Sequence, residues 1–298
     1  MTEARQARQE RAAERNRAIR VVLWSILAAN WAVAAAKVAL GLAIGSTSMT
    51  ADGLHSFIDG GSNVIGLVAM HFASQPPDRE HPYGHQKFEA LAALAIGVMI
   101  GMGALELGRM AWRAIVHDTH PTVGPLAVGV MLGTLAINLV VTRVERSWGE
   151  KLGSALLLAD ARHTLSDVFV TAAVLSSLAL SWLGVRRVDG VVALAVLVFV
   201  AWTGWTILRQ AVGILADTAR IDPQKIREAV LALPEVLAVH DVRSRGMEGS
   251  VYVDLKIDVD SAASVEHAHR LADAVEEALT QAFPEIVDVV VHVEPRVR

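Results

Sequence analysis

The sequence of 298 residues contains no cysteine, and only 19% of its residues are charged. The lack of cysteine excludes disulfide bonds and thiolate metal ligands, so a bound metal ion would have to be held by histidine and carboxylate side chains. Aromatic residues make up 5% of the chain, whereas hydrophobic residues make up 53% and the mean hydropathy is +0.41. This composition is too apolar for an ordinary soluble domain and indicates a membrane protein.

The charged residues are absent from six long stretches. Each stretch has 16 to 22 residues, close to the roughly 20 residues that a helix needs to cross a bilayer. The predicted fold is therefore an α-helical membrane protein with six transmembrane helices. With flanking residues included, these helices are expected near residues 18–43, 47–74, 88–115, 121–144, 153–182 and 188–212.

Basic residues predict how these helices are oriented. Lys and Arg are enriched in cytoplasmic loops, and here they favour the side of the N-terminal segment, so both termini are expected in the cytoplasm. No small-residue cleavage site follows the first apolar run, so the N-terminus is not read as a cleavable signal, and the inner (plasma) membrane is the expected location. That side holds Arg5, Arg8, Arg11, Arg15, Arg17, Arg20, Arg79, Lys87, Arg143, Arg146 and Lys151, against Arg113, Arg186 and Arg187 on the other.

The composition changes near residue 215, where a polar, acidic segment begins. Helical patterns over 221–233 and 265–283 and strand patterns over 236–245, 250–260 and 287–293 predict a small α+β domain of order αββαβ, with its helices on one face of the sheet. The chain is thus expected to divide into a cytoplasmic N-terminal tail (1–17), a six-helix transmembrane domain (18–215) and a cytoplasmic metal-sensing and dimerisation domain (216–298).

Two predicted membrane helices carry the same pattern of ionisable residues, D-x2-H-x3-D. It comprises Asp52, His55 and Asp59 in the second helix and Asp160, His163 and Asp167 in the fifth. Residues at i, i+3 and i+7 share one helix face, and ionisable groups inside a membrane normally face a cavity and a partner. Together His55, Asp59, His163 and Asp167 would form an N2O2 site that suits tetrahedral zinc.

The alternative for this pattern is a set of polar contacts between helices. A pair of matching histidine–aspartate rows favours the metal site over that alternative. Asp52 and Asp160 lie one turn earlier in each helix and could act as further ligands, or as acceptors and helix contacts around the site, which is the favoured role.

Three segments of the sequence together resemble the cation diffusion facilitator family. They are the two D-x2-H-x3-D helices, the segment from Asp78 to Glu89 (DREHPYGHQKFE), and the ending from Val289 to Pro295 (VVVHVEP). The resemblance covers nearly the whole chain from about residue 20. It implies a homodimer, a cytoplasmic domain with a metallochaperone-like fold, and proton-coupled export of zinc by alternating access, with His55, Asp59, His163 and Asp167 as the transport site. Relatives also handle cadmium, cobalt, iron or nickel, and a carboxylate-only site would suit manganese better.

The resemblance also implies further sites on the cytoplasmic side. Asp78, His81 and His85 match a metal site in the loop between the second and third helices, although a solvated loop is the alternative and Pro82 argues against a continuous helix there. Lys87 matches a lysine that pairs with an aspartate after the sixth helix, here Asp217. In the C-terminal domain the matching metal ligands are His240, His269, His292 and Glu294.

One residue of the C-terminal domain departs from the pattern of the family. Lys256 stands where some relatives carry a histidine ligand, and its ammonium would repel a metal ion. This departure predicts one zinc or a weaker regulatory site there, or histidines that only line the domain surface.

The ligand types predict competition between metal and protons, because imidazole and carboxylate must be deprotonated to bind metal. The expected partners are therefore a divalent metal ion, most of all Zn²⁺ as substrate and regulator, together with protons, membrane lipid and a second copy of the chain, but no nucleic acid. An enzyme is not expected, because no nucleophile or H-E-x-x-H segment accompanies the ligands. A membrane metal sensor or scaffold without transport is the remaining alternative.

Overall fold

The computed structural model describes residues 2–43, 56–57, 60–117, 125–182, 188–247 and 249–296. The chain forms two compact units, a helical unit over Met1–Val212 and a C-terminal unit over Gly213–Arg298.

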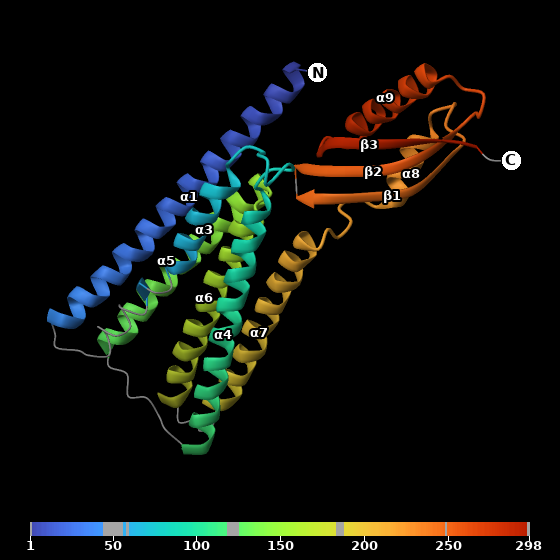
Figure 1. The fold of residues 1–298 in the computed structure, drawn as a ribbon. Helices are drawn as coiled ribbons and strands as arrows, with labels where there is room; N and C mark the ends of the chain where they lie inside the picture. The colour runs from blue at the N-terminus through green and yellow to red at the C-terminus, as the bar shows by residue number, and fades with distance from the viewer. Residues whose placement is uncertain are drawn as a thin grey trace. The chain divides into compact units, whose positions relative to one another are not determined.

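The helical unit is a bundle of long helices (Figure 1). In chain order these are α1 (Thr2–Ala43), α3 (Gly61–Ala73), α4 (Lys87–His117), α5 (Pro125–Leu152), α6 (Ala155–Trp182) and α7 (Val188–Leu215). They correspond to the six predicted transmembrane helices, and the start of the second predicted helix lies outside the described residues.

Two helices extend further than the sequence predicts. Helix α1 begins at Thr2 and not near residue 18, because the arginine-, alanine- and glutamate-rich start of the chain consists of strong helix formers. Helix α5 continues past residue 144 to Leu152. It ends at Gly153, whose φ of 56° is the left-handed conformation that commonly follows a helix. Ser154 then caps α6, since its Oγ accepts the N–H of Leu157 at 3.2 Å.

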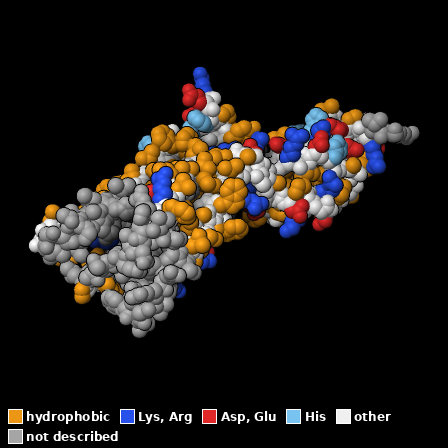
Figure 2. Space-filling view, turned by 90° about the horizontal axis from the view of Figure 1, so that it is seen from below, with side chains coloured by type: hydrophobic (Ala, Val, Ile, Leu, Met, Phe, Trp, Pro, Cys, Tyr) orange, Lys and Arg blue, Asp and Glu red, His pale blue; other side chains and the backbone are white. Residues whose placement is uncertain are grey.

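The surface of the helical unit suits a lipid environment. Four helical segments in the described part of the chain are long and apolar enough to cross a membrane, namely Ala13–Leu40, Lys87–Glu106, Val128–Leu152 and Leu194–Leu215, and α3 is a shorter apolar helix. Figure 2 shows hydrophobic side chains spread over this unit. Large apolar side chains such as Trp24, Met102, Leu105, Trp202 and Trp205 are exposed there, which in water would be an aggregation liability.

Small residues let α4 and α7 approach closely. A Cβ atom added to Gly97 of α4 would lie 3.0 Å from the Leu208 side chain of α7, and one added to Gly204 of α7 would lie 3.2 Å from Ile100 of α4. This reciprocal arrangement is typical of membrane helices, whose association depends on close packing.

The C-terminal unit has the predicted αββαβ order. It comprises α8 (Pro223–Leu231), β1 (Ala238–Met247), β2 (Ser250–Val259), α9 (Val265–Ala282) and β3 (Ile286–Pro295), with β2 central, antiparallel to β1 and parallel to β3. Helices α8 and α9 contact each other and the sheet. Every second residue of β2, from Val251 to Val259, is buried in the core that these helices cover. The intervening residues of β2, Lys256 and Asp258 among them, occupy the opposite face of the sheet.

Both helices of this unit begin at a capping side chain. Asp222 caps α8 by accepting the N–H of Gln224, and Ser264 caps α9 by accepting the N–H of His267. The pairing of β1 with β2 shifts between His240 and Arg243, and Asp241 adopts a φ of 51° in this bulge. The bulge places the side chain of Asp241 beside Lys256.

Candidate metal sites

Helix α6 carries two of the four predicted transport ligands. His163 and Asp167 lie one turn apart and are both partly buried. Neither Nδ1 nor Nε2 of His163 has a hydrogen-bond partner in the described part of the chain, although both atoms are buried. An unpaired buried polar atom costs about 1–3 kcal/mol, a cost that a bound ligand would offset. His55 and Asp59 lie outside the described residues, and the four-ligand arrangement therefore stays a prediction.

Asp160 is held in a polar layer one turn before His163. It is 1% exposed, and its carboxylate accepts hydrogen bonds from the Nδ2 of Asn63 and from the hydroxyl of Ser62. Asn63 in turn accepts from the Nδ2 of Asn30 at 3.1 Å, which links α1, α3 and α6. These contacts favour the role of an acceptor beside the site over the role of a ligand. The other candidate of this kind, Asp52, lies outside the described residues.

The same layer contains Glu145, a residue that the sequence analysis missed. It is fully buried on α5, and its Oε2 accepts the Thr164 hydroxyl at 3.1 Å. The fourth helix was predicted to end near residue 144, one residue before Glu145. A helical pattern continued to Gly153 would have placed this carboxyl in the bundle.

A buried ion pair fixes the start of α6. Glu89 of α4 is 1% exposed and receives the Arg15 guanidinium of α1 at 3.1 Å. It also accepts hydrogen bonds from the Ser154 hydroxyl and from the N–H of Leu156. Arg15 donates to the carbonyl oxygens of Leu152 and Gly153 as well. One end of the bundle, with α1, α4 and the turn between α5 and α6, is thereby tied together.

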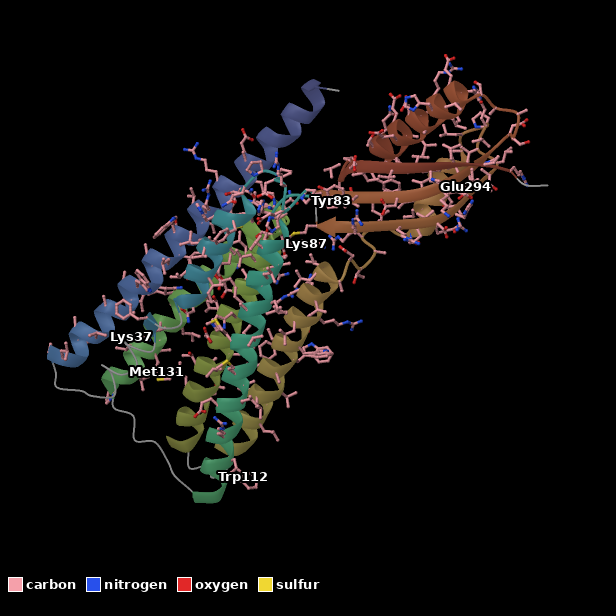
Figure 3. The ribbon with its side chains drawn as sticks, in the orientation of Figure 1. Lys37, Tyr83, Lys87, Trp112, Met131 and Glu294 are labelled. Atoms are coloured by element: carbon pink, nitrogen blue, oxygen red, sulfur yellow. The ribbon has the colours of Figure 1, made fainter. Side chains whose placement is uncertain are left out.

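The loop before α4 brings together the three residues predicted for the loop site. One potential ligand atom from each of Asp78, His81 and His85 lies within 4.8 Å of the others. The Asp78 carboxylate is 3.4 Å from His81 Nδ1 and 3.4 Å from His85 Nε2, and His85 is buried. The segment is not helical, as Pro82 predicts. Tyr83 and Lys87, which flank this site, are labelled in Figure 3.

Backbone N–H groups of this loop orient the Asp78 carboxylate and favour its ionised form. The N–H groups of His81 and Glu80 donate to the carboxylate at 2.6 and 2.9 Å. The bond from His81 is the main reason that the pKa of Asp78 lies below its usual value, and the two imidazoles lower it further. Two imidazoles and one ionised carboxylate form a donor set that zinc accepts.

The C-terminal unit gathers a different cluster from the one predicted. His240, Asp258 and Glu294 bring their potential ligand atoms within 4.8 Å of one another. His240 Nε2 lies 2.9 Å from Asp258 and 3.6 Å from Glu294, which is labelled in Figure 3. Asp258 was not among the ligands predicted for this domain. Its signal in the sequence was the alternation of β2, which puts it on the same face as Lys256.

The two other predicted histidines of this unit differ in their positions. His292 pairs with Glu294 at 3.4 Å and borders the cluster. His269 instead faces Asp273 along the exposed side of α9 and is not part of the cluster. Helix α9 covers the opposite face of the sheet, which explains the separation.

Lys256 occupies the middle of this cluster. Its Nζ lies 3.0 Å from Asp241 and 3.3 Å from Glu294. The hydrogen bond to Asp241 is the first cause that raises the pKa of Lys256, followed by the hydrogen bond to Glu294. An ammonium therefore already takes up part of the negative charge that a metal ion would need.

The remaining predicted pair consists of Lys87 and Asp217. Lys87 is the first residue of α4 in the helical unit, and Asp217 follows α7 in the C-terminal unit, with a φ of 56°. The two residues belong to different units, and an ion pair between them stays a prediction.

A bundle of apolar helices that buries histidine and aspartate, joined to a small α+β domain, defines the class of membrane cation transporters. Comparison with known proteins specifies the family. Residues 23–216 match the model of the cation efflux transmembrane domain, and residues 219–296 match that of the cytoplasmic domain of cation efflux proteins. The chain belongs to the cation efflux, or cation diffusion facilitator, family, which is a family of transporters and not of enzymes.

Individual relatives match along most of their length. The cation-efflux pump FieF of Yersinia pestis is 34% identical over 253 residues, which cover 84% of each chain. An uncharacterized transporter of Methanocaldococcus jannaschii is 30% identical over 262 residues, which cover 87% of this chain and 92% of the relative. Among solved structures, a copper form of the MamM C-terminal domain is 30% identical over 25% of this chain and 92% of its own, with a TM-score of 0.24.

Proposed function

We propose that this chain exports a divalent transition metal, zinc in the first place, from the cytoplasm in exchange for protons. The observation that carries the proposal is the buried His163 imidazole, whose two nitrogens have no partner among the described residues. It stands one turn from Asp167 in a pattern that recurs at His55 and Asp59. The Yersinia relative is a cation-efflux pump, which supports the direction of transport.

Zinc is the proposed substrate because of the ligand chemistry. Two imidazoles and two carboxylates suit tetrahedral Zn²⁺, and imidazole disfavours the harder manganese ion. Iron, cadmium, cobalt and nickel are alternative substrates of the same site. Without cysteine, the chain lacks the thiolates that would select a soft monovalent metal.

Proton coupling follows from competition for the same atoms. His163 must be neutral and Asp167 ionised to bind metal, so that metal binding on one side and protonation on the other exclude each other. The helices would need two arrangements, each of which opens the site to one side. The proposal includes a homodimer in the inner membrane, surrounded by lipid, with both termini in the cytoplasm.

The loop and C-terminal clusters are proposed to serve regulation. Asp78, His81 and His85 form the better prepared of the two, because their carboxylate is already oriented by backbone N–H groups. The cluster of His240, Asp258 and Glu294 would bind metal more weakly, since Lys256 contacts Glu294.

The decisive experiment measures zinc uptake into proteoliposomes under an imposed proton gradient. Replacing Asp167 with Ala should lower the initial rate at least about 100-fold, because the metal loses an anionic ligand. Replacing Glu150 with Gln should leave it unchanged, because Glu150 is an exposed residue paired with Arg146. Zinc flux in the Asp167 variant at the wild-type rate would refute the site, and flux that ignores the proton gradient would refute antiport. A chain that binds zinc but never moves it would be a sensor.

A further inference from the structure

Glu145 is a buried carboxyl group that the proposed transport site does not use. It is 0% exposed on α5, and its Oε2 accepts the Thr164 hydroxyl at 3.1 Å. Its Oε1 is also buried and receives no hydrogen bond from any N–H or hydroxyl group that the structure describes. A carboxylate in this position would keep one oxygen desolvated and unpaired, which is costly.

The carboxyl group of Asp160 on α6 lies within hydrogen-bonding reach of the Glu145 carboxyl group. A hydrogen bond between two carboxyl groups requires that one of them carries a proton. Asp160 already accepts hydrogen bonds from Asn63 and Ser62, which favour its ionised form. The proton is therefore placed on Glu145, which donates it to Asp160.

The charged groups around this pair do not replace the proton. Asp167 and His163, on the same helix as Asp160, are the ionisable groups that act on the pair from α6. On α1, which also packs against α5, Arg15 binds Glu89 and Lys37 donates a hydrogen bond to Ser56. On α5 itself, Arg146 pairs with Glu150 at the exposed surface.

We infer that the Glu145–Asp160 pair stores one of the protons that are exchanged for metal, an inference that rests on the proposed antiport. Asp160 lies one turn from His163, so a divalent ion bound there acts on the pair at short range, where its charge strongly favours proton loss. On metal binding the O–H bond of Glu145 breaks, and the proton passes to water. When the metal leaves, the pair takes up a proton again.

A purely structural role makes a different prediction. If Glu145 only joins α5 to α6, a glutamine would serve as well, because its amide donates to Asp160 and its oxygen still accepts from Thr164. Glutamine cannot release a proton. The Glu145→Gln variant therefore separates the two roles.

The experiment records zinc and proton fluxes together in proteoliposomes that contain a zinc dye and a pH dye. Wild-type protein gives a ratio of protons to zinc, and Glu145→Gln should lower it by about one proton per zinc ion, since one titrating group is lost. Asp160→Asn should give the same loss, and the double variant no further loss, because the pair holds a single proton. Glu150→Gln, on the same helix, should keep the wild-type ratio.

The outcomes distinguish this inference from the proposed function. An unchanged ratio in Glu145→Gln overturns the inference while antiport stands, whereas wild-type protein without proton-coupled zinc flux overturns both. If Glu145→Gln carries no zinc, infrared difference spectra of the wild-type protein decide. A protonated-carboxyl band should disappear on zinc addition, and a band that persists would overturn the inference.

Discussion

His163 is costly for stability when its buried ring is unpaired, but the same ring nitrogens are suited to bind a metal ion. Both of its ring nitrogens are buried and have no hydrogen-bond partner among the described residues, and a group of this kind costs stability for as long as it stays unpaired. A bound ligand can offset this loss of stability, and a zinc ion would occupy one of the two nitrogens. Stability and transport should therefore respond in opposite directions to its removal.

Replacing His163 with Leu tests this opposition. Leucine has a similar volume and leaves no polar atom unsatisfied, so the variant should match or exceed the wild type in stability, by up to about 1–2 kcal/mol. Zinc transport should fall at least about 100-fold, because the imidazole ligand is lost. Thermal unfolding in detergent and proteoliposome flux measure the two quantities. A variant that is clearly less stable would show that His163 is a structural contact.

Lys256 acts in the C-terminal cluster as a fixed cation. Its folded-state pKa is raised by the hydrogen bonds to Asp241 and Glu294. A raised pKa of this kind contributes stability that is fully present below the ordinary lysine pKa and is lost only as the pH rises through the higher folded value. The ammonium therefore stays charged throughout the physiological range and competes there with any metal ion.

Replacing Lys256 with Gln should strengthen zinc binding by the C-terminal cluster about 10-fold or more, because a repelled divalent ion gains roughly 1.4 kcal/mol or more. Zinc titration of the full-length protein, with the loop ligands His81 and His85 replaced by Ala, reports this affinity. Lys225→Gln, on the exposed side of α8, is the matched control. Equal affinities in wild type and the Lys256 variant would mean that this lysine does not limit the site.

At the scale of elements, the start of α6 depends on a single carboxylate. Glu89 receives Arg15, Ser154 and the Leu156 N–H, so that three helices meet at one buried group. Buried pairs of this type contribute little net stability when intact, but removing one partner leaves the other uncompensated.

Glu89→Ala should therefore lower the free energy of unfolding by about 3–5 kcal/mol. Arg15 would lose its partner, and the Ser154 hydroxyl its acceptor. Glu106→Ala, an exposed residue of the same helix that pairs with Arg109, should have little effect, because surface pairs contribute about 0–1 kcal/mol. Thermal or denaturant unfolding in detergent compares the stability of the two variants. A similar loss of stability in both would contradict the role of Glu89 as the anchor of α6.

At the scale of the whole molecule, the C-terminal unit has its own core and its own sheet. A unit of this kind can regulate the helical unit without being required for its insertion. If metal binding in the C-terminal unit tightens a dimer, it biases the equilibrium between the two open states.

Deleting residues 217–298 should leave a chain that inserts into the membrane but transports zinc several-fold more slowly, without activation by zinc on the cytoplasmic side. Proteoliposome flux at a series of zinc concentrations measures both effects. A truncated chain with the same rate and the same concentration dependence as the full-length protein would remove the regulatory role.

Local patterns of the sequence were sufficient for much of this molecule. Six helices follow from the absence of charge, and the order αββαβ follows from the helical patterns around α8 and α9 and from the alternation in β2. The recurrence of D-x2-H-x3-D singles out His163 as a predicted metal ligand. The hydropathy signal ends, however, where polar residues remain helical, and so it missed the start of α1 and the end of α5.

Contacts between distant residues were not accessible in this way. Arg15, Glu89 and Ser154 are separated by 74 and 65 positions, and no local periodicity relates them. Glu145 and Asp160 likewise come close to each other only after α5 and α6 fold back on each other. Asp241 reaches Lys256 because of a bulge with a left-handed residue, a feature that an aspartate permits but does not dictate.

The anchor at Glu89 also determines how α6 can move. A helix that is pinned at its first turn can pivot there, but it cannot slide along its own axis. At 1.5 Å per residue, His163 lies about 12 Å and Trp182 about 40 Å from Ala155. If α6 pivots as a rigid rod, a swing of about 10 Å at the far end moves His163 by only about 3 Å. In that case the predicted ligands His163 and Asp167 would move much less than the far end of α6, which would make the larger displacement.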